Sequence, residues 1–208
     1  MAKLPEPPAV AVLAARAPDV HVLPAGSELW RLYFRGGDYP TRWSTFRFYG
    51  PVHTARFDHH APPPRVQSRG ILYAAASGPT CIAEVFQSRR LIDRSGQQPW
   101  LAGFAITRTV ALLNLCGAWA TAAGASMALA SGPRPRAQRW SAAIYAAYPD
   151  LDGLWYPSSM YANQPAVAFY ERGAGALPAA PFFHLPLSDP SLFDPLSHLA
   201  RSLGYGLI

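Results

Sequence analysis

The segment from residue 70 to residue 86 constrains the fold of this chain most, because it joins a buried strand directly to a helix. Residues 70–76 (GILYAAA) form an apolar run of strand length. Residues 77–80 (SGPT) then open a helix, with a proline near the first helical position. The apolar stripe along this helix consists of Cys81, Ile82, Val85 and Phe86. A helix with one apolar stripe is predicted to pack on the sheet that contains the preceding strand.

The rest of the chain alternates short strands with few helices. Strand-forming segments are predicted at residues 28–34, 101–107, 110–116, 154–156, 166–170 and 182–187. Residues 101–107 and 110–116 suggest a strand pair, and residues 118–131 are weakly helical or a loop. A helix is expected at residues 136–148, because large apolar residues recur every four positions and a proline follows. This pattern predicts an α+β fold with mixed, largely antiparallel sheets and flanking helices.

The chain length of 208 residues fits a single domain with extensions better than two full domains. Residues 1–27 are rich in Ala and Pro and are predicted to form a partly ordered arm. Residues 28–188 contain most of the expected strands and helices and form the predicted domain. Residues 189–208 are a tail in which a short helix is possible after Pro195.

The composition favours a protein with a sizeable core. Half of the residues (50%) are hydrophobic and 14% are charged, against about 25% in typical domains. No apolar run is long enough to cross a bilayer, and the N-terminus lacks the apolar segment of a secretory signal. Cys81 and Cys116 lie in apolar surroundings, so we expect buried, reduced thiols in a cytoplasmic protein without membrane contact.

The net charge of +6 comes from 18 basic residues, nearly all of them Arg. Arg forms forked hydrogen bonds with phosphate, so a nucleotide or another phosphate ligand fits this charge. Nucleic acid fits as well, although no compact run of basic residues marks a binding face. A genome rich in Arg and Ala codons would explain the same charge without any ligand.

Familiar catalytic signatures are absent from the sequence. It contains no G-x-x-x-x-G-K loop, no G-x-G-x-x-G after a strand, no G-x-S-x-G and no H-E-x-x-H. His59 and His60 beside Asp58 could be metal ligands, but adjacent side chains converge poorly on one ion. No Cys or third His lies at a suitable spacing either, so we expect no metal site.

Three polar residues in apolar surroundings are the candidates for a functional site: Arg31 in LWRLYFR, Glu84 in TCIAEVF and Ser158 in GLWYPSSMY. Such residues are expected at the edge of a core, facing a cleft, and together they suit an anionic, hydroxylated ligand. Glu84 lies off the apolar stripe and is expected in the first helical turn, where the helix dipole favours a carboxylate. Taken singly, each residue also has an ordinary explanation, as a strand-end ion pair, a surface carboxylate or a turn cap.

Five short pieces in a fixed order make the sequence resemble a known family. The pieces are W-R-L-Y, A-R-F-D, I-L-Y-A-A-A-S, A-E-V-F and D-G-L-W-Y-P-S-S, followed by an apolar strand at residues 166–169. With this order and spacing, the chain resembles the RES-domain family from residue 28 to residue 171. The residues that match the family's motif are Arg31, Arg56, Tyr73, Glu84 and Ser158. The chain departs from the family at Ala55, where Gly often precedes the Arg, and at Ser159, where many members have Arg.

The resemblance implies a toxin of a toxin–antitoxin pair, with an ADP-ribosyltransferase-like fold, that acts on NAD. Arg31 or Arg56 would then bind the diphosphate, and Tyr73 would offer a flat face to the nicotinamide ring. Ser158 would donate to a phosphate or ribose oxygen. Glu84 would stabilise the oxocarbenium-like centre that forms as the nicotinamide–ribose bond breaks, hold a ribose hydroxyl or orient the nucleophile. Water, phosphate and a protein side chain are all possible acceptors.

The resemblance also implies a partner, an antitoxin with an Xre-type helix-turn-helix part that plugs the cleft. A hetero-oligomer with this antitoxin and a homo-oligomer are both open. A different class of function is a non-catalytic nucleic-acid-binding module. Its support is the charge of +6 and the mixture of aromatic residues and Arg between residues 33 and 56, which could stack bases.

Overall fold

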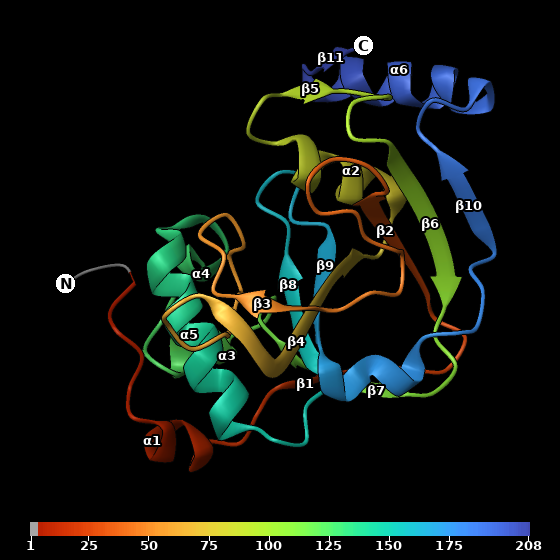
Figure 1. Cartoon of the computed structure of the whole chain (residues 1–208). Helices are drawn as coiled ribbons and strands as arrows, with labels where there is room; N and C mark the ends of the chain where they lie inside the picture. The colour runs from red at the N-terminus through yellow and green to blue at the C-terminus, as the bar shows by residue number, and fades with distance from the viewer. Residues whose placement is uncertain (1–3) are drawn as a thin grey trace.

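A nine-stranded sheet forms the centre of the computed structural model, which describes residues 4–208 (Figure 1). Its strands, in chain order, are β1 (Val20–Leu23), β2 (Glu28–Phe34), β3 (Arg47–Gly50), β4 (Arg65–Ala75), β6 (Pro99–Ala105), β7 (Val110–Asn114), β8 (Gly153–Pro157), β9 (Pro165–Tyr170) and β10 (Phe183–Pro186). Neighbouring strands follow the order β1-β7-β8-β9-β4-β2-β6-β10, and β3 pairs with β4. The β7–β8 pair is parallel, and the other pairs of this sheet are antiparallel.

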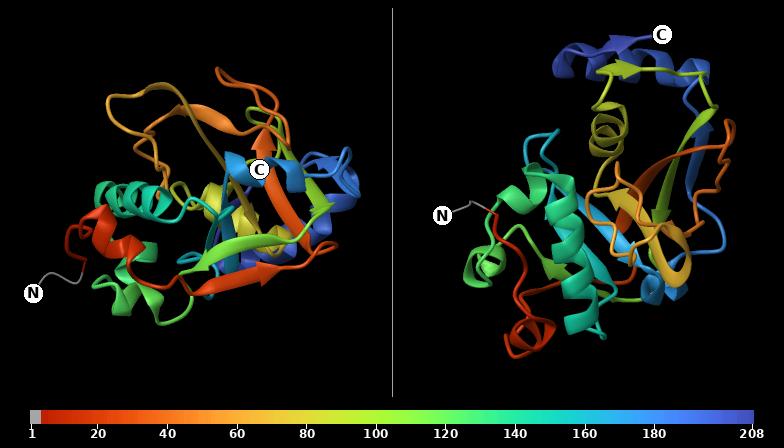
Figure 2. Two further views of the ribbon diagram at one scale, coloured as in Figure 1. Left: turned by 90° about the horizontal axis from the view of Figure 1, so that it is seen from below. Right: turned by 60° about the vertical axis from the view of Figure 1, so that its left-hand side comes forward.

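The helices flank the sheet on two sides. They are α1 (Val10–Ala14), α2 (Gly78–Phe86), α3 (Trp119–Ala122), α4 (Ala128–Ser131), α5 (Arg134–Ala147) and α6 (Phe193–Leu203), with 3-10 turns η1 (Glu171–Ala176) and η2 (Pro190–Leu192). In Figure 1, α1, α3, α4 and α5 gather on one side, whereas α6 lies at the top beside a small parallel sheet of β5 (Leu91–Ile92) and β11 (Gly206–Leu207). Figure 2 shows α1 and α6 at opposite ends of the molecule. The predicted α+β class with a largely antiparallel sheet is confirmed.

Apolar side chains cover both faces of the sheet, and β4 shows how. Ile71 and Ala75 point to one face, whereas Leu72 and Ala74 point to the other, as the two-residue period of a strand requires. On the first face, α2 and α5 complete the core with Cys81, Ile82, Phe86, Trp140 and Ile144. On the second face, the loop between β2 and β3 contributes Trp43 and Phe46.

Helix α2 begins where the sequence predicts it, directly after β4. Ser77 is the N-cap, and its hydroxyl oxygen accepts a hydrogen bond from Thr80 N at 3.3 Å. On the buried stripe, the Cys81 thiol donates to Trp30 O at 2.8 Å. The helix is therefore attached to β2, the strand that carries Arg31.

The helix expected at residues 136–148 is confirmed as α5, which begins two residues earlier, at Arg134. Pro135 lies in its first turn, where a proline is tolerated. Trp140 is fully buried, and its Nε1 donates to Pro5 O at 2.8 Å. Residues 118–131, expected to be weakly helical or a loop, contain the single turns α3 and α4.

The expected pairing of residues 101–107 with residues 110–116 is wrong, although both segments contain strands. β6 pairs with β2 on one edge and with β10 on the other. Because both edges of β6 are occupied, β7 cannot form a hairpin with it and instead pairs with β1 and β8. The Ile106 N–H, which follows β6, donates to Ser27 O at 3.0 Å and keeps β6 aligned with β2.

Both ends of the described chain pack on helices. β1 forms one edge of the large sheet, and the Tyr148 hydroxyl after α5 donates to Leu13 O in α1 at 2.8 Å. At the other end, α6 adds Leu196 and Leu199 to the first core, and the Tyr205 hydroxyl donates to Ala83 O of α2 at 3.5 Å. None of the helices in residues 4–208 is long and apolar enough to cross a membrane.

The two cysteines differ in exposure, and both are free thiols. Cys81 is buried as expected, and burial raises the pKa of its thiol to about 12. Cys116 was expected to be buried, but it is exposed. The reason is its place in the turn after β7, where Leu115 and Trp119 point into the core and Cys116 points outward.

Candidate functional site

Glu84 and Ser158 are in direct contact, although 74 positions separate them in the sequence. The Ser158 hydroxyl donates a hydrogen bond to Glu84 Oε1. The expectation that Glu84 lies in the first turn of its helix is wrong, because the residue lies in the last turn of α2. A helix dipole disfavours a carboxylate near the C-terminus, so the dipole does not explain this position. The hydrogen bond from Ser158 does stabilise the carboxylate there.

Ser158 is fully buried (0% exposed) after the end of β8. Besides donating to Glu84, its Oγ accepts hydrogen bonds from Met160 N at 3.2 Å and Tyr161 N at 3.1 Å. Its backbone N–H donates to Gln164 O at 2.9 Å. The hydroxyl is therefore saturated by protein groups and fixes both the Glu84 carboxylate and the loop that follows β8.

Tyr73 and Arg56 are joined through the residue that follows Arg56. The Tyr73 hydroxyl oxygen accepts a hydrogen bond from Phe57 N at 3.1 Å. Arg56 Nη1 donates to Gly132 O, just before α5, at 2.6 Å. The Phe57 ring packs on Tyr156 of β8, with ring centroids 4.6 Å apart. Five residues in this region are called the Glu84 site below: Arg56, Tyr73, Glu84, Tyr156 and Ser158.

Electrostatic interactions connect the members of the Glu84 site. Burial raises the pKa of Tyr156 well above its usual value, and the charge of Glu84 raises this pKa further. Burial lowers the pKa of Arg56, Arg134 lowers it further, and Glu84 opposes both effects. Burial also raises the pKa of Tyr73. Both tyrosines are therefore neutral at physiological pH, beside one carboxylate and at least one guanidinium.

Arg31 lies on β2, the strand to which Cys81 of α2 is hydrogen-bonded, and it has unused hydrogen-bonding capacity. Its Nη2 donates to Thr45 O at 3.2 Å, whereas the buried Nη1 has no hydrogen-bond partner among residues 4–208. Burial lowers the pKa of Arg31 to about 10, and the nearby charge of Arg47 acts in the same direction, against Cys81 and Tyr33. A buried guanidinium with a free N–H is suited to bind an anion.

Tyr156, Gln87 and Arg134 belong to the surroundings of Glu84 and were not predicted. Gln87 Nε2 donates to Glu84 O at 2.6 Å and to Glu84 Oε2 at 3.3 Å. Arg134 Nη2 donates to Gln87 Oε1 at 3.4 Å. Glu84 and Gln87 are three positions apart on one helix, and this spacing could have predicted their contact. No sequence pattern could have predicted the position of Arg134 near Glu84, because it depends on how α5 packs against the rest of the protein.

A buried carboxylate anchors the segment that carries Arg56. Asp58 is 0% exposed and accepts hydrogen bonds from Val52 N at 2.6 Å, from His60 N at 3.3 Å and from His60 Nδ1. It also forms an ion pair with Arg47 at 2.8 Å. Burial alone would raise the pKa of Asp58, but these partners outweigh burial and lower the pKa to about 2.

The neighbouring His59 is buried in an aromatic environment. Its ring stacks on Tyr145 at 4.3 Å and meets the edge of Tyr170 at 4.6 Å. His59 Nε2 lies 3.9 Å from Glu171 Oε2, too far for a hydrogen bond. Burial is the main cause that lowers the pKa of His59. Burial alone would raise the pKa of Glu171, but His59, the Tyr145 hydroxyl and an N–H from Gly70 lower it to about 2.

We expect the free energy of unfolding to fall in two stages as the pH decreases. The folded-state pKa of His59 is below its ordinary value of 6.5, so stability is full above pH 6.5 and declines below it. Asp58 and Glu171, with ordinary values of 3.8 and 4.5, each add roughly 2 kcal/mol of stability that is lost as the pH falls toward 2. Urea unfolding from pH 2 to pH 8 measures both stages.

The matched variant for the first stage is His59→Phe, which keeps an aromatic ring against Tyr145 but cannot bind a proton. This variant should lose the part of the decline near pH 6.5 that comes from His59 and keep the decline at lower pH. His21 and His184, whose pKa values burial also lowers, keep their own contributions to the first stage. An unchanged first stage in His59→Phe would contradict the assignment to His59.

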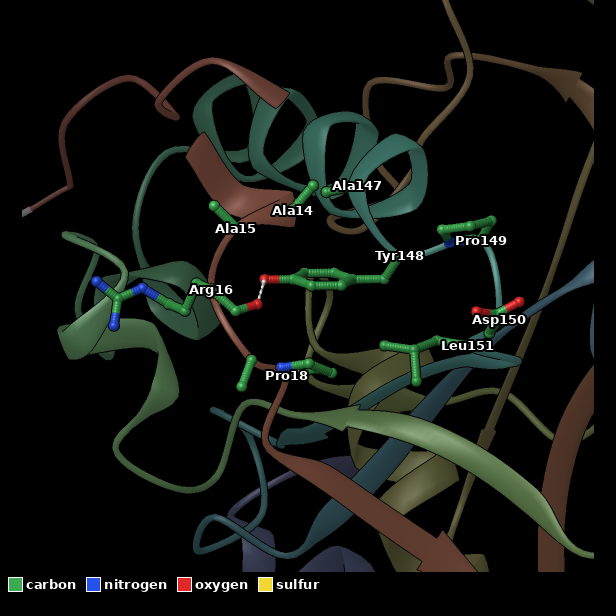
Figure 3. Close-up of a pocket in the computed structure, with 10 residues that line it drawn as sticks. Ala14, Ala15, Arg16, Pro18, Ala147, Tyr148, Pro149, Asp150 and Leu151 are labelled. Atoms are coloured by element: carbon green, nitrogen blue, oxygen red, sulfur yellow. Dashed lines mark hydrogen bonds between the residues drawn. The ribbon is translucent and has the colours of Figure 1, made fainter. Parts of the chain in front are cut away.

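Two hollows of the surface lie outside the Glu84 site. The first, of about 450 Å³, is lined by residues 14–18 and 147–151, between α1 and the end of α5 (Figure 3). The Tyr148 ring lies in this hollow, and its hydroxyl also donates to Arg16 O at 3.2 Å. The second, of about 470 Å³, is lined partly by Gly132, the residue whose carbonyl accepts from Arg56. In residues 4–208, no three His, Cys, Asp or Glu side chains are grouped to hold a metal ion.

The aromatic residues between positions 33 and 56 are split between the core and the surface. Three of them are buried, namely Tyr33, Trp43 and Phe46. Tyr39, Phe48 and Tyr49 are exposed. The exposed group comes from the loop after β2 and from β3, and the buried group cannot stack on bases without unfolding.

Comparison with known proteins gives one family and one structural neighbour. The family model of the RES domain matches residues 28–188. In the solved structures, a chain of the M. tuberculosis MbcT–MbcA toxin–antitoxin complex is similar, with a TM-score of 0.58 and 17% sequence identity. The similarity covers 91% of this chain and 96% of that chain, and it shows a common fold. A search of curated proteins found no match.

Proposed function

The chain belongs to the RES-domain family, and from this premise we propose that it is an NAD-consuming toxin of a toxin–antitoxin pair. The proposed reaction breaks the bond between nicotinamide and ribose. The bonding electrons leave with neutral nicotinamide, and an oxocarbenium-like centre on the ribose then takes up an acceptor. Water gives hydrolysis, inorganic phosphate gives phosphorolysis and a protein side chain gives ADP-ribosyl transfer.

The contact between Glu84 and Ser158 carries this proposal. The Glu84 carboxylate is half-buried and accepts a hydrogen bond from Ser158. It is therefore a negative charge held in place beside two neutral side chains, Tyr73 and Tyr156. A fixed charge in a partly buried site stabilises a developing positive charge without reorganising first. Glu84 is therefore the residue that stabilises the ribosyl cation or orients the acceptor.

The other residues have roles that follow from their contacts. Arg31 supplies a buried N–H without a hydrogen-bond partner in residues 4–208, and Arg56 supplies a guanidinium next to Glu84, so both suit the phosphates of NAD. Tyr73 offers an aromatic face for the nicotinamide ring. Ser158 acts through Glu84 and is a positioning residue, because its hydroxyl is taken up by protein groups.

The direct test is to incubate purified protein with NAD, with and without inorganic phosphate, and to separate the products by mass. ADP-ribose alone indicates hydrolysis, and a phosphorylated ADP-ribose that requires added phosphate indicates phosphorolysis. A mass increase on a protein indicates ADP-ribosyl transfer. No loss of NAD with folded, inhibitor-free protein would contradict the proposal.

We also propose the boundaries and the partner of the active unit. Residues 28–188 form the catalytic domain, and residues 1–27 and 189–208 are extensions. Within residues 4–27, α1 contacts α5 and β1 joins the large sheet, and the C-terminal extension contacts α2. The structural neighbour is part of a toxin–antitoxin complex. By analogy, the partner of this chain is an antitoxin with an Xre-type helix-turn-helix part, which covers the Glu84 site in the cytoplasm. The expected result is poor expression of active protein without that partner and normal expression of an inactive Glu84→Gln variant.

A further inference from the structure

Arg56 and Arg134 bring two positive charges together near Glu84 without a carboxylate ion pair. Arg56 Nη1 donates to Gly132 O, two residues before Arg134, at 2.6 Å. Arg134 Nη2 donates to Gln87 Oε1 at 3.4 Å, a long bond to a neutral amide. In the described part of the chain, no carboxylate oxygen lies within 4.0 Å of either guanidinium.

The two neighbouring arginines of α5 differ from Arg134, because each has a carboxylate partner. Arg136 and Arg139 both pair with Glu6, at 2.9 Å and 2.7 Å. Arg134 instead lies close enough to Arg56 to lower the pKa of that guanidinium. Like charges near one another repel, and an anion bound by both guanidinium groups would offset this repulsion.

We propose that Arg134 is a further substrate-binding residue, which binds the diphosphate of the dinucleotide together with Arg56. This inference rests on the proposed consumption of NAD. A diphosphate presents oxygen atoms on two adjacent phosphorus atoms, and two guanidinium forks match this geometry better than one.

Gln87 connects this subsite to Glu84. Its Nε2 donates to Glu84 Oε2 at 3.3 Å, and its Oε1 accepts from Arg134 at 3.4 Å. One amide side chain therefore fixes the direction of Arg134 relative to the carboxylate. The subsite selects ligands with a diphosphate, and nicotinamide riboside, which lacks phosphate, does not use it.

The kinetic test compares Arg134→Gln with Arg139→Gln, which makes the same charge change on the same helix. Loss of a charge-assisted bond to phosphate should raise the KM for NAD by about tenfold to a hundredfold in Arg134→Gln. The kcat should stay within about threefold, because the bond is present in both ground and transition states. Arg139→Gln should behave as the wild type, and Arg134→Lys should lie between, since Lys has the charge without the fork.

A binding test separates this inference from the proposed function. Calorimetry with adenosine diphosphate should show binding to the wild type and to Arg139→Gln, with affinity about tenfold or more lower in Arg134→Gln. If the wild type consumes no NAD but shows this pattern, the proposed function fails and the diphosphate subsite stands. Equal affinity in all variants, no binding to the wild type, or a fall in kcat at unchanged KM would overturn the subsite.

Discussion

Glu84→Gln is expected to lower the rate of NAD consumption by about 10²–10⁴-fold, the usual contribution of a positioned acid, base or fixed charge. Gln has nearly the same shape, and its amide oxygen can still accept the hydrogen bond from Ser158. The substitution therefore removes the negative charge and leaves the packing of α2 in place. Product formation per unit time, with far-ultraviolet circular dichroism to confirm folding, measures the effect.

The matched control for Glu84→Gln is Glu28→Gln, which makes the same change at an exposed position in β2. Its activity should equal that of the wild type. The same pair of variants tests the nucleic-acid-binding alternative, under which Glu84→Gln leaves binding unchanged or strengthens it. Turnover by Glu84→Gln within tenfold of the wild type would contradict a catalytic role for this carboxylate.

Asp58→Asn is expected to lower the free energy of unfolding by about 3 kcal/mol, as breaking a buried ion pair usually does. The carboxylate accepts hydrogen bonds from Val52 and His60 and forms an ion pair with Arg47. An Asn side chain has one acceptor oxygen and turns an NH₂ group toward the remaining donors. Urea unfolding at pH 7 measures the loss.

Two further variants serve as comparisons for Asp58→Asn. Asp38→Asn removes an exposed carboxylate and should change stability by less than about 0.5 kcal/mol. Arg47→Gln removes a partner whose side chain is 31% exposed, so it should cost less than Asp58→Asn. A loss below about 1 kcal/mol in Asp58→Asn would show that the carboxylate does not anchor the segment.

The sequence was sufficient to predict the elements that depend on local patterns. The β4–α2 unit follows from an apolar run and a Ser-Gly-Pro start, and α5 follows from four-residue spacing and a terminal proline. The Glu84–Ser158 proximity followed from a family motif and not from periodicity. The turn of α2 that holds Glu84 was misjudged, because the helix that starts at Gly78 ends at Phe86, which places Glu84 in its last turn.

The features that could not be predicted from the sequence depend on contacts between distant segments of the chain. β6 and β7 are consecutive in the chain, but β6 pairs with β2 and β10, whereas β7 pairs with β1 and β8. Arg134 approaches Glu84 because α5, which is distant in the sequence, packs on the same face of the sheet as α2. His59 and His60 beside Asp58 were weighed as metal ligands, whereas the structure shows Asp58 buried and hydrogen-bonded to His60 and Val52 beside the Arg56 segment.

The register of β9 on β4 has a consequence for synthesis of the protein. Ile71 pairs with Tyr170, and Glu84 needs Ser158, so neither the sheet centre nor the carboxylate contact exists until about four-fifths of the chain has left the ribosome. Contacts between such distant segments also form slowly. The proposed activity therefore cannot begin before this part of the chain has been made, and the strand order sets the length of this delay.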